Sequence, residues 1–216
     1  MKKIFLAAAL LLGLANAASA DPFGFGIKGG VNMANQVSSF NEGTTQITSD
    51  VLFGFNGGIF MDFQLAGILS LQPEAEFSMK GFQQNIHHIP EVDSSAHILG
   101  YIDGFDNFSF NYLEFPLLLK VHGSMGPDLQ GFLLLGPSLS FLISANTHYS
   151  FAGIGTGGSV LNGAVFDYGL NFGGGLEIGK VILDLRYDLG LASVINHFSE
   201  GNKNSVLSLE FGYRIQ

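Results

Sequence analysis

The residues with the most evident capacity for chemistry are His197 and Ser199, which flank Phe198 near the end of the sequence. In this spacing an imidazole can activate a hydroxyl for nucleophilic attack, with a carboxylate such as Glu210 orienting the imidazole. The pair lies in a polar stretch that is typical of an exposed turn. We therefore predict no catalytic site, and keep a hydrolase that uses His197 and Ser199 as an alternative hypothesis.

Three histidines, His87, His88 and His97, share another polar stretch with Glu91 and Asp93. Imidazoles and carboxylates are ligands for divalent metals, but this spacing matches no recognised metal-site pattern. The chain has no Cys, which removes thiolate ligands, disulfides and thiol nucleophiles together. The sequence predicts no metal site and no cofactor, with the three histidines as the alternative metal ligands.

Composition separates this chain from ordinary soluble domains. Of its 216 residues 47% are hydrophobic and only 12% are charged, which is about half the usual charged fraction. Its 9 basic residues are outnumbered by 18 acidic ones, which excludes the basic surface that nucleic acids require. We predict a single domain that does not bind nucleic acid.

The N-terminus has the three parts of a secretory signal peptide. Lys2 and Lys3 precede an apolar run over residues 4–14, and a small-residue Ala-Ser-Ala site ends at Ala20. The apolar run is shorter than the roughly 20 residues of a membrane-spanning helix. We predict a signal peptide over residues 1–20 that is cleaved after Ala20, and a mature domain over residues 21–216.

Apolar and polar residues alternate with a period of two along most of the mature chain, which is typical of strands with one apolar face. In the last segment, for example, Leu207, Leu209 and Phe211 alternate with polar residues. Eight segments have this pattern: 23–32, 51–64, 68–81, 112–121, 131–143, 166–178, 181–191 and 207–216. Five apolar residues fall on the polar face of two of these segments: Tyr112, Leu118, Phe132, Leu134 and Leu142.

The connections between these segments alternate strictly between short and long. The short ones are residues 65–67, 124–128 and 179–180, and the long ones are 36–49, 84–106, 146–162 and 195–203. Even-numbered barrels of the bacterial outer membrane have this layout, with short periplasmic turns and longer loops outside. The predicted fold is all-β, an eight-stranded antiparallel up-and-down transmembrane β-barrel in the cell outer membrane.

Side-chain volume decides which face of the strands points inward. An eight-stranded barrel has an interior only wide enough for side chains to fill. The polar face is rich in Gly and Ser, which fit a narrow lumen, whereas the apolar face carries Phe, Leu, Ile and Tyr on every strand. The bulky face is therefore expected to contact outer-membrane lipid.

The same assignment brings most of the mature chain's charges into the lumen, where they must be paired because they are poorly hydrated. We predict a lumenal ion-pair network that fills and rigidifies the barrel, with a proton or ion path as the alternative. Its members are Lys28, Lys80, Lys120, Arg186, Arg214, Asp62, Glu74, Glu76, Glu114, Asp167, Glu177, Asp184, Asp188 and Glu210.

Six stretches occur in a distinctive order along the chain: GIKGGVN (26–32), LQPE (71–74), YLEFPLLLK (112–120), GP (136–137), DLRY (184–187) and FGYRI (211–215). In these stretches the chain resembles the PorT-like outer-membrane β-barrel family of Bacteroidota. The resemblance covers essentially the whole mature chain and implies an eight-stranded barrel in the outer membrane. It implies no defined reaction, although one branch of the family serves protein secretion. The barrel assembly machinery is the partner expected during biogenesis.

These observations favour a non-enzymatic outer-membrane barrel of structural or interaction type that presents surface loops to a protein partner. A first alternative is an accessory component of protein secretion or surface assembly, with residues 84–106 and the periplasmic turns as docking surfaces. A second is a hydrolase similar to lipid A deacylases, which are also eight-stranded and carry a His-x-Ser pair like that of His197 and Ser199. A narrow channel is disfavoured by the bore.

Overall fold

The computed structural model describes residues 23–37, 41–42, 45–92, 98–151, 154–159, 166–191 and 203–216. The expected signal peptide over residues 1–20 lies outside these ranges. Among the described residues, no helix is long and apolar enough to cross a bilayer.

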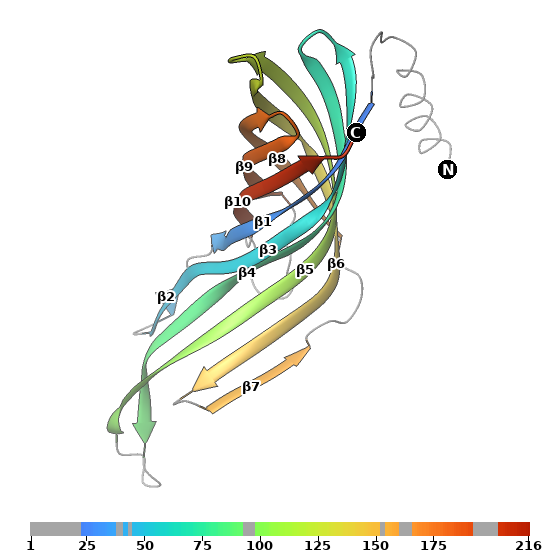
Figure 1. The fold of residues 1–216 in the computed structure, drawn as a ribbon. Helices are drawn as coiled ribbons and strands as arrows, with labels where there is room; N and C mark the ends of the chain where they lie inside the picture. The colour runs from blue at the N-terminus through green and yellow to red at the C-terminus, as the bar shows by residue number, and fades with distance from the viewer. Residues whose placement is uncertain are drawn as a thin grey trace.

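Ten strands make up the regular structure of the described chain (Figure 1). They are β1 (Phe23–Val37), β2 (Asn41–Glu42), β3 (Thr45–Ala66), β4 (Leu69–Val92), β5 (Ile98–Ser124), β6 (Leu129–Phe151), β7 (Ile154–Ser159), β8 (Phe166–Ile178), β9 (Val181–Gly190) and β10 (Lys203–Arg214). Eight of them form the barrel wall, whereas β2 pairs only with β3 and β7 only with β6.

The wall is a closed antiparallel cylinder. The strands follow one another in the order β1-β10-β9-β8-β6-β5-β4-β3, and β1 also pairs with β3 to complete the ring. On one side of β1, Gly26 lies opposite Arg214, and on the other side Gly26 lies opposite Phe60. Closure gives every wall strand a partner on both edges, which is the requirement for backbone inside hydrocarbon. The eight-stranded antiparallel barrel predicted from the sequence is confirmed.

Tight turns connect neighbouring strands at one end of the cylinder, which we call the turn end. Two-residue turns join β3 to β4 and β8 to β9, and each begins with a glycine of positive φ, Gly67 (51°) and Gly179 (58°). Glycine adopts this conformation without the steric cost that a Cβ imposes, and such turns match the twist of paired strands. Both chain ends of the described barrel, Phe23 and Gln216, lie at this end as well, because the Phe25 amide donates to the Gln216 carbonyl at 3.0 Å.

The opposite end, which we call the hairpin end, is uneven (Figure 1). Strands β3 to β6 contain 22 to 27 residues, whereas β8, β9 and β10 contain 10 to 13. A transmembrane strand needs only about 9–11 residues, so the longer strands continue well beyond the hydrocarbon layer.

The long strands correct the expected loop boundaries. Most of residues 84–106 is not an irregular loop but the continuation of β4 to Val92 and of β5 from Ile98. Residues 146–151 extend β6, residues 154–159 form β7, and β3 begins at Thr45. Outside the bilayer a strand pair can continue with polar side chains on both faces, so the apolar alternation that marks a membrane strand ends before the backbone pairing does.

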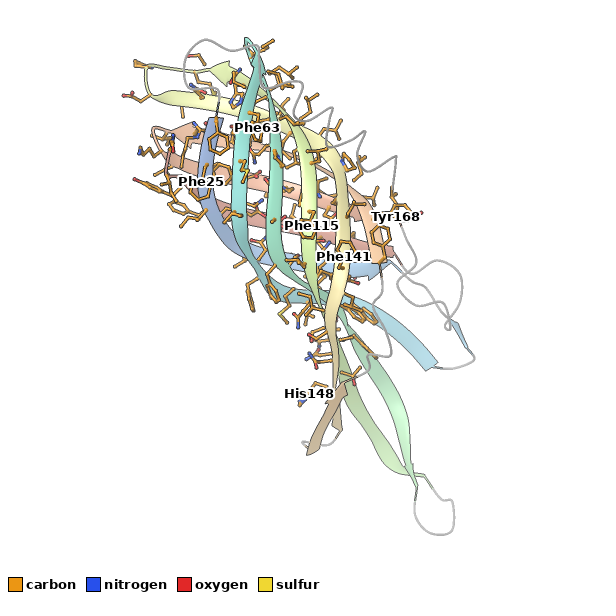
Figure 2. The ribbon with its side chains drawn as sticks, turned by 90° about the vertical axis from the view of Figure 1, so that its right-hand side faces the viewer. Phe25, Phe63, Phe115, Phe141, His148 and Tyr168 are labelled. Atoms are coloured by element: carbon orange, nitrogen blue, oxygen red, sulfur yellow. The ribbon has the colours of Figure 1, made fainter. Side chains whose placement is uncertain are left out.

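The outer face of the wall is apolar. Phe53, Leu133 and Phe211 expose 71%, 69% and 57% of their surfaces. Most other large hydrophobic residues whose side chains point to the same side of the wall strands are also exposed. Figure 2 shows Phe115, Phe141 and Tyr168 on this wall. Phe141 contacts Phe115 and Phe166 on the neighbouring strands, with ring centroids 6.0 and 5.4 Å apart. Such a continuous apolar surface needs lipid as its solvent.

Candidate functional site in the barrel lumen

The period of two places alternate residues of each wall strand inside the cylinder. All fourteen charged residues expected there have inward parity: twelve are buried, the Lys28 side chain is 5% exposed, and only Arg214 retains 27% of its side-chain surface. The charges are not spread evenly. Thirteen of them form three clusters along the axis, which we name from their positions: the turn-end, central and hairpin-end clusters.

The turn-end cluster contains Lys120, Arg214, Asp62 and Glu177, one residue each from β5, β10, β3 and β8. Lys120 Nζ contacts a Glu177 carboxylate oxygen and lies 3.6 Å from Asp62 Oδ2. Arg214 Nη2 lies 3.0 Å from Glu177 Oε2 and 3.3 Å from Asp62 Oδ2. Two cations therefore face two carboxylates, so the cluster is neutral when all four are ionised.

The central cluster contains two cations and four carboxylates: Lys28, Arg186, Glu74, Glu76, Asp184 and Glu210. Arg186 forms a two-pronged contact with Glu74, at 2.7 and 3.2 Å, and its Nη2 lies 2.5 Å from Asp184 Oδ2. Lys28 Nζ lies 2.5 Å from Glu74, 2.9 Å from Glu210 and 3.1 Å from Glu76. The six side chains expose at most 6% of their surfaces, so this acidic excess is sealed from solvent.

The hairpin-end cluster contains Lys80, Glu114 and Asp188. Lys80 Nζ lies 2.5 Å from Glu114 Oε1 and also contacts Asp188 Oδ2. The Ser140 hydroxyl donates to Glu114 at 2.6 Å. Asp167 is buried opposite Ser140 in the β6–β8 pairing, and its Oδ1 accepts the Tyr168 amide at 2.7 Å.

Two apolar clusters lie among these charges, although Gln72 still bridges the turn-end and central clusters: it accepts from Lys120 Nζ at 3.0 Å and donates to Glu74 Oε1 at 2.6 Å. The first apolar cluster consists of Phe60, Leu118, Phe132, Leu134 and Ile182, and lies between the turn-end and central clusters. Lys120 Nζ lies 4.2 Å from the centroid of the Phe132 ring. A cavity at this level has a volume of about 10 Å³, which is about the space of one water molecule.

The second apolar cluster lies beyond the hairpin-end cluster and consists of Phe82, Phe110, Tyr112, Leu142 and Ala145. The five apolar residues that fell on the polar face of the sequence pattern are thus all lumenal and belong to these two clusters. The alternation of inside and outside is intact at these positions. What changes is that the lumen contains apolar layers as well as charged ones.

Neutral polar side chains link the central cluster to the hairpin side. Asn56 Nδ2 donates to Glu210 Oε1 at 2.9 Å and to Asn32 Oδ1 at 2.7 Å. Asn32 in turn donates to Ser78 at 3.1 Å, and the Ser208 hydroxyl donates to Asn32 at 2.8 Å. These four residues were not among the predicted site residues. Their inward parity was the available signal, because an amide or hydroxyl facing a closed lumen needs a partner there.

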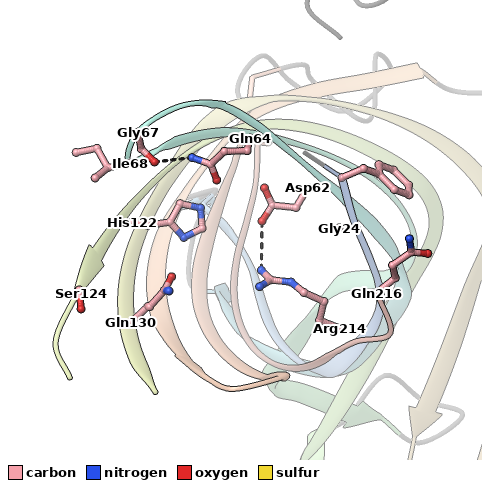
Figure 3. A pocket seen from close by; sticks show the side chains of 11 residues that line it. Gly24, Asp62, Gln64, Gly67, Ile68, His122, Ser124, Gln130, Arg214 and Gln216 are labelled. Atoms are coloured by element: carbon pink, nitrogen blue, oxygen red, sulfur yellow. Dashed lines mark hydrogen bonds and ion pairs between the residues drawn. The ribbon is translucent and has the colours of Figure 1, made fainter. Parts of the chain in front are cut away.

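A wider cavity opens at the turn end (Figure 3). It has a volume of about 460 Å³, and Asp62, Gln64, His122, Gln130 and Arg214 are among its lining residues. Figure 3 shows the ion pair between Asp62 and Arg214 within this ring of polar side chains. The turn-end cluster therefore borders an open vestibule, whereas the central cluster lies deeper in the barrel.

The structure describes only some of the residues that were named as alternative catalytic residues or metal ligands. His197, Ser199 and His97 lie outside the described residues. His87 and His88 belong to the extension of β4, where only the backbone is described. Among the described residues no group of three or more His, Asp or Glu side chains could hold a metal ion.

The lumen can hold charge rigidly because each cluster draws side chains from several strands. Glu74 alone joins β4 to Lys28 on β1 and to Arg186 on β9. Ion pairs of this kind, removed from water, contribute little net stability relative to a well-packed apolar core, but removing one partner is strongly destabilising. The arrangement therefore connects strands that are not neighbours in the sheet, such as β4 and β9.

A closed eight-stranded cylinder with a lipid-compatible exterior and a charged interior defines an outer-membrane β-barrel. Residues 15–196 match the family described as "Outer membrane protein beta-barrel domain". The chain belongs to this family and is an outer-membrane protein. None of the curated proteins matches the sequence.

Several solved structures are similar to the chain. Ail, the attachment invasion locus protein of Yersinia pestis, is 13% identical, with 89% of this chain and 98% of that chain covered and a TM-score of 0.38. Neisserial surface protein A is 12% identical, with 88% and 96% covered and a TM-score of 0.44. OprG from Pseudomonas aeruginosa is 15% identical, with 89% and 96% covered and a TM-score of 0.43.

Proposed function

We propose that this protein is a non-enzymatic outer-membrane barrel that acts as a rigid anchor and presents its long hairpins to a protein partner. The observation that carries this proposal is the contrast between the filled lumen and the extended strands. Three charge clusters and two apolar clusters occupy the bore. Conduction through such a lumen would require side chains from several strands to move together.

The long hairpins are the part of the barrel that supports an interaction role. Strands β4 and β5 remain paired from the turn end to Val92 and Ile98, far beyond the length that crosses hydrocarbon. In outer-membrane barrels the tight turns face the periplasm and the longer connections face outward. The β4–β5 and β6–β7 hairpins would therefore project from the cell surface.

The first test separates the anchor from the surface it presents. Gln83 and Asn107 are cross-strand partners on β4 and β5, so an Asn-Gly turn can replace residues 84–106 at that point. The shortened barrel should still shift its mobility on a denaturing gel between unheated and boiled samples, while losing proteins that crosslink to the full-length chain in whole cells. Identical crosslinking patterns for both proteins would contradict the proposal.

The bore itself is tested by planar-bilayer recording. Purified full-length barrel should produce no discrete conductance steps in molar potassium chloride, with a known porin inserted into the same bilayer as the positive control. Reproducible single-channel steps that depend on the amount of this protein would overturn the anchor and favour the ion path.

A PorT-like accessory role in protein secretion is the finer form of the same proposal. The vestibule at the turn end supports it, because a cavity of about 460 Å³ lined by amide, imidazole and ionised side chains would face the periplasm. Deletion of the gene should then reduce the amount of secreted protein, and a chain with residues 84–106 replaced should restore secretion if docking occurs at the vestibule. Normal secretion in the deletion strain would remove this form.

A lipid A hydrolase using His197 and Ser199 is the enzymatic alternative. Under our proposal, a Ser199→Ala variant leaves the mass spectrum of lipid A from the host unchanged relative to wild type and to a deletion strain. Loss of a deacylated species in both the variant and the deletion strain would establish the hydrolase instead.

A further inference from the structure

Three oxygen atoms converge beside Gly169, inside the barrel near the hairpin-end cluster. A Cβ built on Gly169 would lie 2.9 Å from Asp188 Oδ1, 2.9 Å from the Leu189 carbonyl oxygen and 3.1 Å from Ser138 Oγ. Glycine at residue 169 therefore lets a carboxylate, a carbonyl and a hydroxyl oxygen approach the backbone more closely than a Cβ would allow, and we call this oxygen-lined site the cradle. The three come from β9 and β6, with β8 forming the floor.

Two of these oxygens are buried without hydrogen-bond partners in the described part of the chain. Ser138 is 2% exposed and Asp188 is 7% exposed, yet neither Ser138 Oγ nor Asp188 Oδ1 has a partner. Buried polar atoms are almost always satisfied, because desolvation without a partner is costly. A cation coordinated by both oxygen atoms would give each of them a partner.

The local charge identifies the kind of ligand. Asp188 uses its other oxygen, Oδ2, to contact Lys80, which also pairs with Glu114. One ammonium thus faces two carboxylates, leaving one negative charge in excess within this contact set. Burial makes an uncompensated charge expensive, so one further positive charge would be stabilised.

We propose that the barrel binds one monovalent cation, sodium in its chemistry, between Ser138, Asp188 and the Leu189 carbonyl. Hard cations prefer oxygen ligands such as these. A single carboxylate that is already shared with Lys80 supplies too little charge for a divalent ion. An ordered water molecule would satisfy the two oxygens but would leave the excess charge in place.

Cation-dependent stability tests the site with the purified barrel in detergent. Thermal unfolding is followed by gel mobility in sodium chloride and in choline chloride at the same ionic strength. A cation that binds only the folded state raises the unfolding midpoint by mass action. We expect wild type to unfold at a higher temperature in sodium, with a difference that grows with sodium concentration.

Variants locate the effect. Ser138→Ala removes one ligand without adding bulk, and Gly169→Ala fills the cradle. Each should reduce the sodium-dependent shift by at least half. Ser208→Ala removes a lumenal hydroxyl of the same type, which bonds to Asn32 instead, and should retain the full shift.

Crystals soaked in thallium(I) provide a readout that does not depend on variant folding. An anomalous peak in contact with Ser138 and Asp188 is the expected result. Equal unfolding midpoints in sodium and choline together with no anomalous peak would overturn the proposal and assign the cradle to water. A sodium shift that persists undiminished in both Ser138→Ala and Gly169→Ala would overturn this location.

Discussion

The turn-end and central clusters are built from the same side-chain types but solve different electrostatic problems. The turn-end cluster balances two cations with two carboxylates beside an open vestibule, where Arg214 retains partial solvent contact. The central cluster places four carboxylates around Lys28 and Arg186 with almost no exposure. If one charged residue is removed, water can partly compensate the remaining charges in the turn-end cluster, but it cannot reach those in the central cluster. Depth in the bore, rather than the number of ion pairs, should therefore decide how much each residue matters.

The largest effect is expected from Arg186→Met in the central cluster. The substitution leaves four buried carboxylates with Lys28 as their cation, and removal of one partner from a buried ion pair costs about 3–5 kcal/mol. The free energy of unfolding, measured by urea titration of the barrel in detergent with circular dichroism, should fall by this amount. Adding Glu74→Gln and Asp184→Asn to the same chain removes the stranded charges and should recover part of the loss. A single-variant loss no larger than that of an Arg214 variant would contradict the comparison.

A second, somewhat smaller effect is expected from Leu118→Ala in the apolar layer between the two clusters. Leu118 is fully buried, and truncation of such a residue costs about 2–5 kcal/mol through lost transfer energy and a residual cavity. The same urea titration measures the loss. Leu117→Ala is the matched control, because Leu117 is exposed on the outer face and lipid or detergent can fill the space. Equal losses for both variants would mean that the layer is not tightly packed.

The smallest effect is expected from Arg214→Met in the turn-end cluster. Arg214 retains 27% of its side-chain surface, whereas its partners Glu177 and Asp62 are buried, so the loss should lie between the about 0–1 kcal/mol of an exposed ion pair and the about 3–5 kcal/mol of a buried one, towards the lower end. This loss of unfolding free energy should shrink further when the titration is repeated in high salt, because salt screens exposed charges. A loss that equals that of Arg186→Met, or one that is independent of salt, would show that the vestibule does not screen this cluster.

The sequence was sufficient to predict the barrel and the inward parity of its charged residues. A period of two cannot be used by a helix, and the bulk of the apolar face assigns that face to lipid. The pattern could not show how the charges divide along the axis, because the pairing of Lys28 with Glu74 or of Lys80 with Glu114 depends on strand register. Register is a property of the assembled sheet rather than of one segment.

Local irregularities also escaped the sequence pattern. Tyr112 pairs with Leu142 and Asn111 pairs with Ser144, so Ile143 is an extra residue on β6. This bulge reverses the parity of β6, and Ala145 therefore faces the lumen although it has an odd number. A bulge leaves no composition signal of its own. The extent of β4 and β5 was missed for a related reason, since pairing outside the bilayer does not require apolar side chains.

The seam between β1 and β10 joins the first described strand of the chain to the last. Residues 203–214 must be synthesised before β1 and β9 can both be paired, so a growing chain carries two open edges until its final strand emerges. An open edge cannot be tolerated in hydrocarbon. Insertion of the finished wall therefore has to follow translation, and a copy that ends before residue 203 would have no stable place in the bilayer.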